Sequence, residues 1–188
     1  MAYNNAWANH RLLAAAGKLV TSAFLDATRT SFFPSISQTL NHNVTVDWFY
    51  VDALERALGG AEVNPDARRF FEPEEPFRDC ASLAAAQRAV DRRLVLLCVA
   101  LDEHKLETRV GIQRRTGVVY DSAMRILAHL FQHQIHHRGQ AHAMFAGTSV
   151  PPPQLDEFFC ANEANLRAAE LSQLGYSEAL IWGSVAEK

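Results

Sequence analysis

Four histidines lie between positions 129 and 137, and this cluster is the part of the sequence best suited to chemistry. The surrounding residues have helical periodicity, and helical residues four apart lie one turn apart on the same face. Two neutral imidazoles placed in this way can bind one zinc, nickel, copper or iron ion. His129 and His137 are about 12 Å apart along a helix axis, too far to share an ion. The helix therefore offers either His129 with His133 or His133 with His137.

A third ligand is expected from another helix, because metal sites in helical bundles are built from facing helices. His42 is the only histidine in the helical segment 35–58. It lies away from the aliphatic stripe of that segment, on a second apolar side with Val46, Phe49 and Ala53. A lone histidine on such a side is where a third metal ligand would stand.

Four long segments with helical periodicity must position these histidines. They cover roughly residues 3–19, residues 35–58, a third segment that begins near Asp79 or Ser82 as its N-cap, and residues 120–145. Residues 64–76 carry three prolines and are predicted as a loop. Residues 106–119 suggest a small hairpin turning at Thr116-Gly117, and shorter helices are predicted over residues 154–182. The pattern predicts an all-α four-helix bundle, with one domain over residues 1–188.

The composition argues against several classes of protein. The 188 residues have a formal net charge of −3, which gives no reason to expect a nucleic-acid or membrane partner. The longest apolar run, residues 94–101, is far too short to cross a bilayer, and no export signal is recognisable. Three scattered cysteines argue against a disulfide framework. We therefore expect a cytoplasmic protein.

The sequence resembles the DinB family of helical metal-binding proteins over nearly its whole length. The resemblance is carried by Tyr3-Asn4…Trp7-Ala8-Asn9, by Phe33…Ser35-Ile36…Thr39-Leu40-Asn41-His42…Asp47, and by Leu127-Ala128-His129…His133-Gln134…His136-His137-Arg138-Gly139-Gln140. In this family one histidine of the second helix and two of the fourth bind the metal, which implies His42, His133 and His137 here. The resemblance also implies an up-down-down-up bundle, a homodimer, and nickel or zinc as the divalent ion.

Three neutral histidines would leave a divalent ion with an open coordination position, where a bound water or thiol becomes acidic. Relatives in the family include thiol-dependent S-transferases and a mycothiol-dependent isomerase. The resemblance therefore implies a metal-dependent enzyme, S-transferase-like or hydrolase-like, that acts on a small molecule with a low-molecular-weight thiol as a candidate partner. The alternative is a non-catalytic metal-binding helical dimer with a structural or stress-response role. Gln134 stands where a zinc peptidase needs its glutamate base, so that signature is absent.

Four more residues are candidates for the surroundings of the metal. Gln140 shares the helix face of the paired histidines, and Tyr3, Trp7 and His10 share one face of the first helix. As a fourth ligand, His10 would favour the non-catalytic alternative.

Asp47 requires a partner of its own. On a helical wheel it points into the aliphatic stripe of segment 35–58, where a carboxylate needs a cation or a hydrogen-bond donor. We predict a structural pair between Asp47 and Arg138. No residue stands out in the sequence as a general base.

Overall fold

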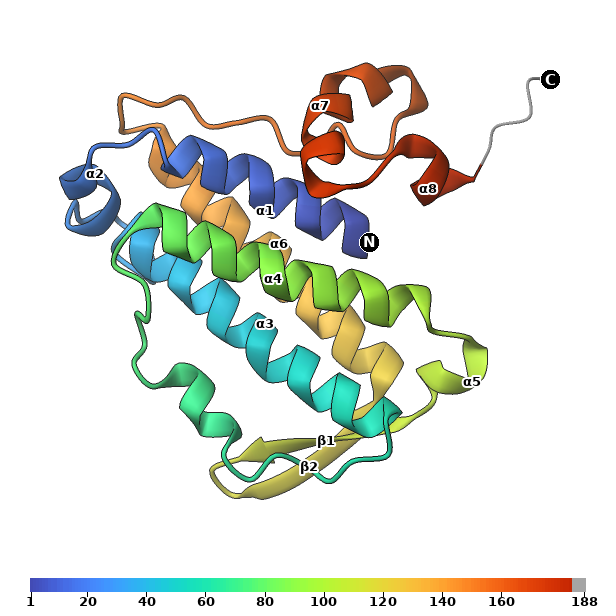
Figure 1. The fold of residues 1–188 in the computed structure, drawn as a ribbon. Coiled ribbons are helices and arrows are strands. Elements are labelled where there is room, and N and C mark those ends of the chain that lie inside the picture. Colours follow the sequence, from blue (N-terminus) through green and yellow to red (C-terminus); the bar gives the residue numbers. More distant parts are fainter. Residues whose placement is uncertain (184–188) are drawn as a thin grey trace.

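The computed structural model describes residues 1–183, and four long helices form its body (Figure 1). These helices are α1 (Ala2–Ala16), α3 (Ile36–Leu58), α4 (Cys80–Val99) and α6 (Ala123–Phe145). In Figure 1, α1 and α6 run in one direction and α3 and α4 in the other, so the topology is up-down-down-up. The predicted all-α bundle is confirmed. Residues 184–188 of the predicted single domain lie outside the described residues.

Short elements complete the fold. They are α2 (Thr21–Leu25), η1 (Ala67–Phe71), α5 (Glu103–Leu106), the antiparallel strands β1 (Arg109–Arg114) and β2 (Gly117–Ser122), η2 (Ala161–Glu163), α7 (Ala164–Leu174) and α8 (Glu178–Trp182). The predicted hairpin and C-terminal helices are present, although β2 extends beyond the predicted hairpin. The sequence did not predict α2, α5 or η1, because four or five residues are too few to show helical periodicity.

Side-chain caps fix where the long helices begin. The Ser35 hydroxyl accepts the backbone N–H of Gln38 at 3.1 Å, and the Asp79 carboxylate accepts that of Ser82 at 2.8 Å. Each cap satisfies a backbone donor that has no partner within its helix. The Asp79 bond also decides between the two N-caps considered for this helix.

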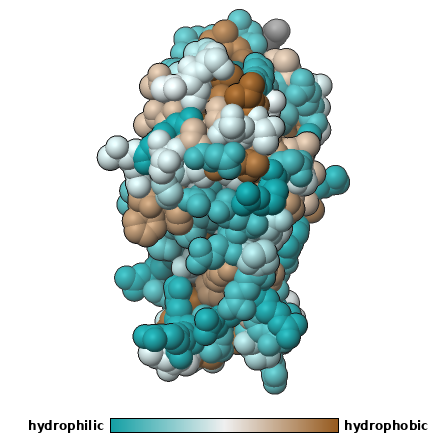
Figure 2. Space-filling model, turned by 90° about the vertical axis from the view of Figure 1, so that its left-hand side faces the viewer, coloured by the Kyte–Doolittle hydropathy of each residue, from teal (hydrophilic) through white to brown (hydrophobic). Residues whose placement is uncertain are grey.

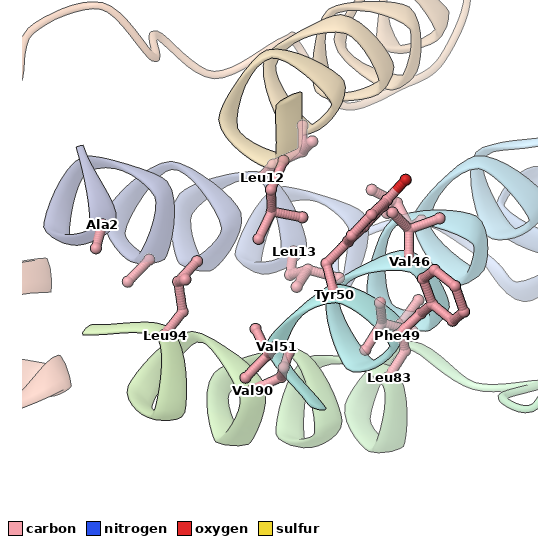
Figure 3. Close-up of a cluster of buried hydrophobic side chains, with 14 of the residues drawn as sticks. Ala2, Leu12, Leu13, Val46, Phe49, Tyr50, Val51, Leu83, Val90 and Leu94 are labelled. Atoms are coloured by element: carbon pink, nitrogen blue, oxygen red, sulfur yellow. The ribbon is translucent and has the colours of Figure 1, made fainter. Parts of the chain in front are cut away.

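A shared apolar core packs the four long helices against one another. Figure 3 shows Leu12 and Leu13 of α1, Val51 of α3, and Val90 and Leu94 of α4 within this cluster, and all five are buried. Burying one aliphatic side chain of this size stabilises a fold by about 1.5–3 kcal/mol. This packing supports α3 and α6, the two helices that carry the histidines.

The surface is mixed in character. Figure 2 views the end of the bundle where α2 lies and shows hydrophobic side chains in small patches between hydrophilic ones. Within residues 1–183, no helix combines the length and the apolar character needed to cross a bilayer.

Candidate metal centre

Three imidazoles from two helices meet on one side of the bundle. The Nε2 atoms of His42 on α3 and His133 on α6 lie 3.1 Å apart. The ring centre of His137, one turn further along α6, lies 4.7 Å from that of His42 and 4.5 Å from that of His133. One nitrogen from each ring can be chosen so that all three lie within 4.8 Å of one another. The long packing of α3 against α6 creates this arrangement.

These residues fit a divalent metal ion. Two nitrogen ligands of one ion each lie about 2.0–2.1 Å from it, so a spacing of 3.1 Å between them is suitable. Imidazole must be neutral to bind a metal. Burial, together with the charge that His137 would carry, lowers the pKa of His42 to about 4. Burial and the neighbouring histidines lower the pKa of His133 to about 3, and burial lowers that of His137. All three rings are therefore in the ligating form at neutral pH.

Gln140 orients one of these rings. Its side-chain oxygen lies 2.7 Å from Nδ1 of His137, and an amide oxygen can only accept a hydrogen bond. Nδ1 therefore carries the proton, and Nε2 of His137 keeps its lone pair for a metal. The Gln140 amide nitrogen lies 3.2 Å from Nε2 of His136, to which it can donate. A bond of this kind to the outer nitrogen holds a ligating histidine in position.

The geometry separates the alternatives that spacing left open on α6. His129 is exposed, and its ring packs edge-on against Tyr50 with centroids 5.2 Å apart. It is not part of the three-nitrogen group, which consists of His42, His133 and His137. His136 is also exposed and contacts this group only from the side, through His137 and Gln140.

Phe33 covers the histidines, a role that the sequence did not reveal. Its ring centre lies 4.5 Å from that of His42 and 5.5 Å from that of His137. Phe33 belongs to the loop between α2 and α3, where no periodicity indicates which side chains face inwards. An aromatic ring here reduces the access of water to one side of the cluster.

The candidates on the first helix lie elsewhere, so that expectation is corrected. Tyr3 packs edge-on against Tyr176, and the fully buried Trp7 packs against Phe158. Nε2 of His10 lies 3.0 Å from the side-chain oxygen of Gln173 on α7. The C-terminal segment packs on this face of α1, because its own apolar side chains are buried against Tyr3 and Trp7.

A second polar group lies deep between the helices. Asp47 of α3 accepts hydrogen bonds from Gln134 of α6 at 2.7 Å and from Gln87 of α4 at 2.6 Å. Asp91 of α4 accepts bonds from Gln87, from Asn5 at 3.1 Å and from Asn9 at 3.0 Å. Gln134, the residue after the ligand candidate His133, therefore has a structural role as a hydrogen-bond donor to Asp47.

The expected direct pair between Asp47 and Arg138 is wrong in its detail. Among residues 1–183, no carboxylate lies within ion-pairing distance of the buried Arg138. Its guanidinium donates instead to the side-chain oxygens of Asn5 and Asn9, whose amide nitrogens bond Asp91. The sequence could not show that two asparagines of α1 would lie between Arg138 and Asp91.

This network makes stability depend on pH. Burial, followed by the charge of Asp91, raises the pKa of Asp47 to about 8, while an unfolded aspartate titrates near 4. Between these values the folded chain keeps a proton that the unfolded chain has lost, so the free energy of unfolding falls as pH rises. We expect Asp47→Asn to remove this fall, which is at most about 1.4 kcal/mol per pH unit. Urea unfolding of metal-free protein between pH 6.5 and 8 measures it.

The readout is the difference in slope between wild type and Asp47→Asn, not the stability at one pH. The histidines and cysteines are the same in both proteins, and the pKa of Asp91, raised by burial to about 6, lies below this pH range. Parallel pH profiles for the two proteins would contradict a protonated Asp47.

Comparison with known proteins adds one match. The model of the DinB family matches residues 1–170, which include all four long helices and the three clustered histidines. No curated protein and no solved structure matches the chain.

Proposed function

The chain belongs to the DinB family, and we propose that it is a metal-dependent enzyme that activates a thiol or a water for reaction with a small molecule. The observation that carries this proposal is the group of His42, His133 and His137, three neutral donors on one side of the bundle. Three-histidine sites with an open position are typical of catalytic zinc, whereas structural zinc sites have four protein ligands. When bound, the ion would supply positive charge that acidifies a water or thiol.

The protein's own residues would prepare this chemistry. His42 and His133 offer neutral nitrogens at a suitable spacing, and Gln140 keeps the proton of His137 on Nδ1. Phe33 shields His42 and His137 from water on one side. Shielding strengthens the electrostatic interactions of a site, because the effective dielectric constant falls when water is excluded.

The alternative function is a metal site without turnover, in a structural or stress-response protein. A fourth protein ligand would support it. His10, the candidate for that ligand, is bonded to Gln173 of α7. This placement favours the enzyme.

Three further properties belong to the proposal. Nickel and zinc are the proposed ions, because imidazole suits both and the family is associated with metals. A homodimer is proposed from the family and from the exposed Leu96 and Val99, which lie one turn apart on α4. A cytoplasmic location agrees with Cys80, Cys98 and Cys160, which are all free thiols.

The test is whether a metal held by this protein accepts an external ligand. Metal-free protein is loaded with Co²⁺, whose visible absorption reports its ligands, and titrated with 2-mercaptoethanol. We expect a new sulfur-to-cobalt absorption band that saturates at one thiol per ion. His137→Ala, loaded in the same way, should not give this spectrum.

An unchanged spectrum at saturating thiol, with cobalt bound, would indicate a closed site and would support the non-catalytic alternative. With a band present, zinc-loaded protein is then assayed for transfer of the thiol to electrophiles. Turnover by wild type, lost in His137→Ala, is the result expected of the enzyme.

A further inference from the structure

A cleft borders Gln140, the residue that bonds His137. Its volume is about 650 Å³, within the range of small-molecule sites. One wall is the loop after α2, with Thr28, Arg29 and Ser31, and the other is the last turns of α6, with Gln140 and Met144. Gln140 is therefore the residue that links the cleft to the histidine group.

Arg29 is the cation of this cleft. Its guanidinium donates to the backbone oxygens of Ala27 at 2.6 Å and Ala23 at 3.2 Å, and its own backbone N–H donates to the carbonyl of Pro34 at 2.8 Å. Within the described part of the chain, no carboxylate lies within 4.0 Å of it. The loop thus holds a half-buried guanidinium in place without neutralising it.

A guanidinium that is held in place and not neutralised suits an anionic group with two adjacent oxygens, such as a carboxylate. Arginine presents five N–H donors, and two backbone carbonyls do not use them all. A carboxylate accepts two parallel N–H bonds from such a group, and charge-assisted bonds are about twice as strong as neutral ones. Thr28 and Ser31 line the same wall, and each carries a hydroxyl group that can act as a neutral donor.

We propose that this cleft binds the carboxylate end of a thiol substrate and that Arg29 is the residue that recognises it. This inference rests on the proposed function, because the thiol end would reach the metal past Gln140. An ion held by His42, His133 and His137 would supply the positive charge that stabilises the thiolate, and the proton of the broken S–H bond would pass to solvent. Nothing is oxidised or reduced in this step.

The experiment compares thiols that differ only in charge. The Co²⁺-loaded protein is titrated with 6-mercaptohexanoate and with 6-mercaptohexanol, and with the shorter pair 3-mercaptopropionate and 3-mercaptopropanol, and the sulfur-to-cobalt band is followed. We expect at least one acid to bind about tenfold or more tightly than its alcohol. Arg29→Gln should reduce that preference to nearly none and leave the alcohol's affinity unchanged. Arg29→Lys should retain part of it, because the charge remains while the paired geometry is lost.

Lys18→Gln is the matched control, because Lys18 is an exposed cation outside the cleft and its loss changes the net charge equally. It should leave the preference intact. Equal binding of acid and alcohol at both chain lengths, or the same loss of preference in Lys18→Gln, would overturn the assignment of Arg29. Failure of every thiol to produce the band would instead refute the proposed function, so the two failures are distinguishable.

Discussion

Replacing His133 with alanine is expected to remove the divalent ion, about one per chain, from the purified protein. Nε2 of His133 lies 3.1 Å from that of His42, and its ring lies beside that of His137 on the same helix. Its loss leaves two ligands on different helices. Losing only an outer-shell partner of a ligand costs about 10–100-fold in metal affinity, and losing a ligand should cost more. Elemental mass spectrometry of protein purified without chelator or nickel-affinity resin measures the content.

His129→Ala is the matched control for this variant. It removes an imidazole one turn earlier on α6. This ring packs on Tyr50 and lies outside the three-nitrogen group. We expect it to keep its metal. Equal metal content in wild type and His133→Ala, with both folded by circular dichroism, would contradict the proposed centre. That result would mean that these histidines serve only in the packing of the bundle.

Replacing Arg138 with methionine is expected to destabilise the fold by about 3–5 kcal/mol, the cost of removing one partner from a buried charge group. The side chain is buried and donates to Asn5 and Asn9. Burial lowers the pKa of Arg138 to about 10, so it still carries its charge at neutral pH. Without it, the buried carboxylate of Asp91, which is ionised at pH 7 because its pKa is raised only to about 6, would have no compensating cation. Urea unfolding of the metal-free protein at pH 7 measures the loss.

Arg125→Met is the control for this second prediction. It stands on the same helix, but its side chain is 73% exposed and lies 3.7 Å from the carboxylate of Asp121. Exposed pairs of this kind contribute about 1 kcal/mol or less. A double variant, Arg138→Met with Asp91→Asn, should recover part of the stability by removing an unpaired charge. A loss in Arg138→Met no greater than that in Arg125→Met would show that the buried network is not an electrostatic unit.

The sequence by itself determined what depends on local chemistry. Periodicity located the four long helices, and Asp79 was one of the two N-caps considered for the third of them. The structure adds Ser35 and Ser122 as the caps of α3 and α6, whereas α1 has no side-chain cap. The four-residue spacing of His133 and His137 placed both on one face of α6. His42 could be singled out because it stands alone on an apolar side of its helix.

Tertiary structure decided everything that required knowing which faces meet. The packing of α3 on α6 selected His133 with His137 over His129 with His133, two choices that are equivalent on the helix itself. It put Phe33 over the histidines and Arg29 in the cleft, both from a loop without periodicity. It also turned Tyr3 and Trp7 towards the C-terminal segment and inserted asparagines between Arg138 and Asp91. Each of these outcomes depends on contacts between residues distant in the chain, which spacing along one helix does not encode.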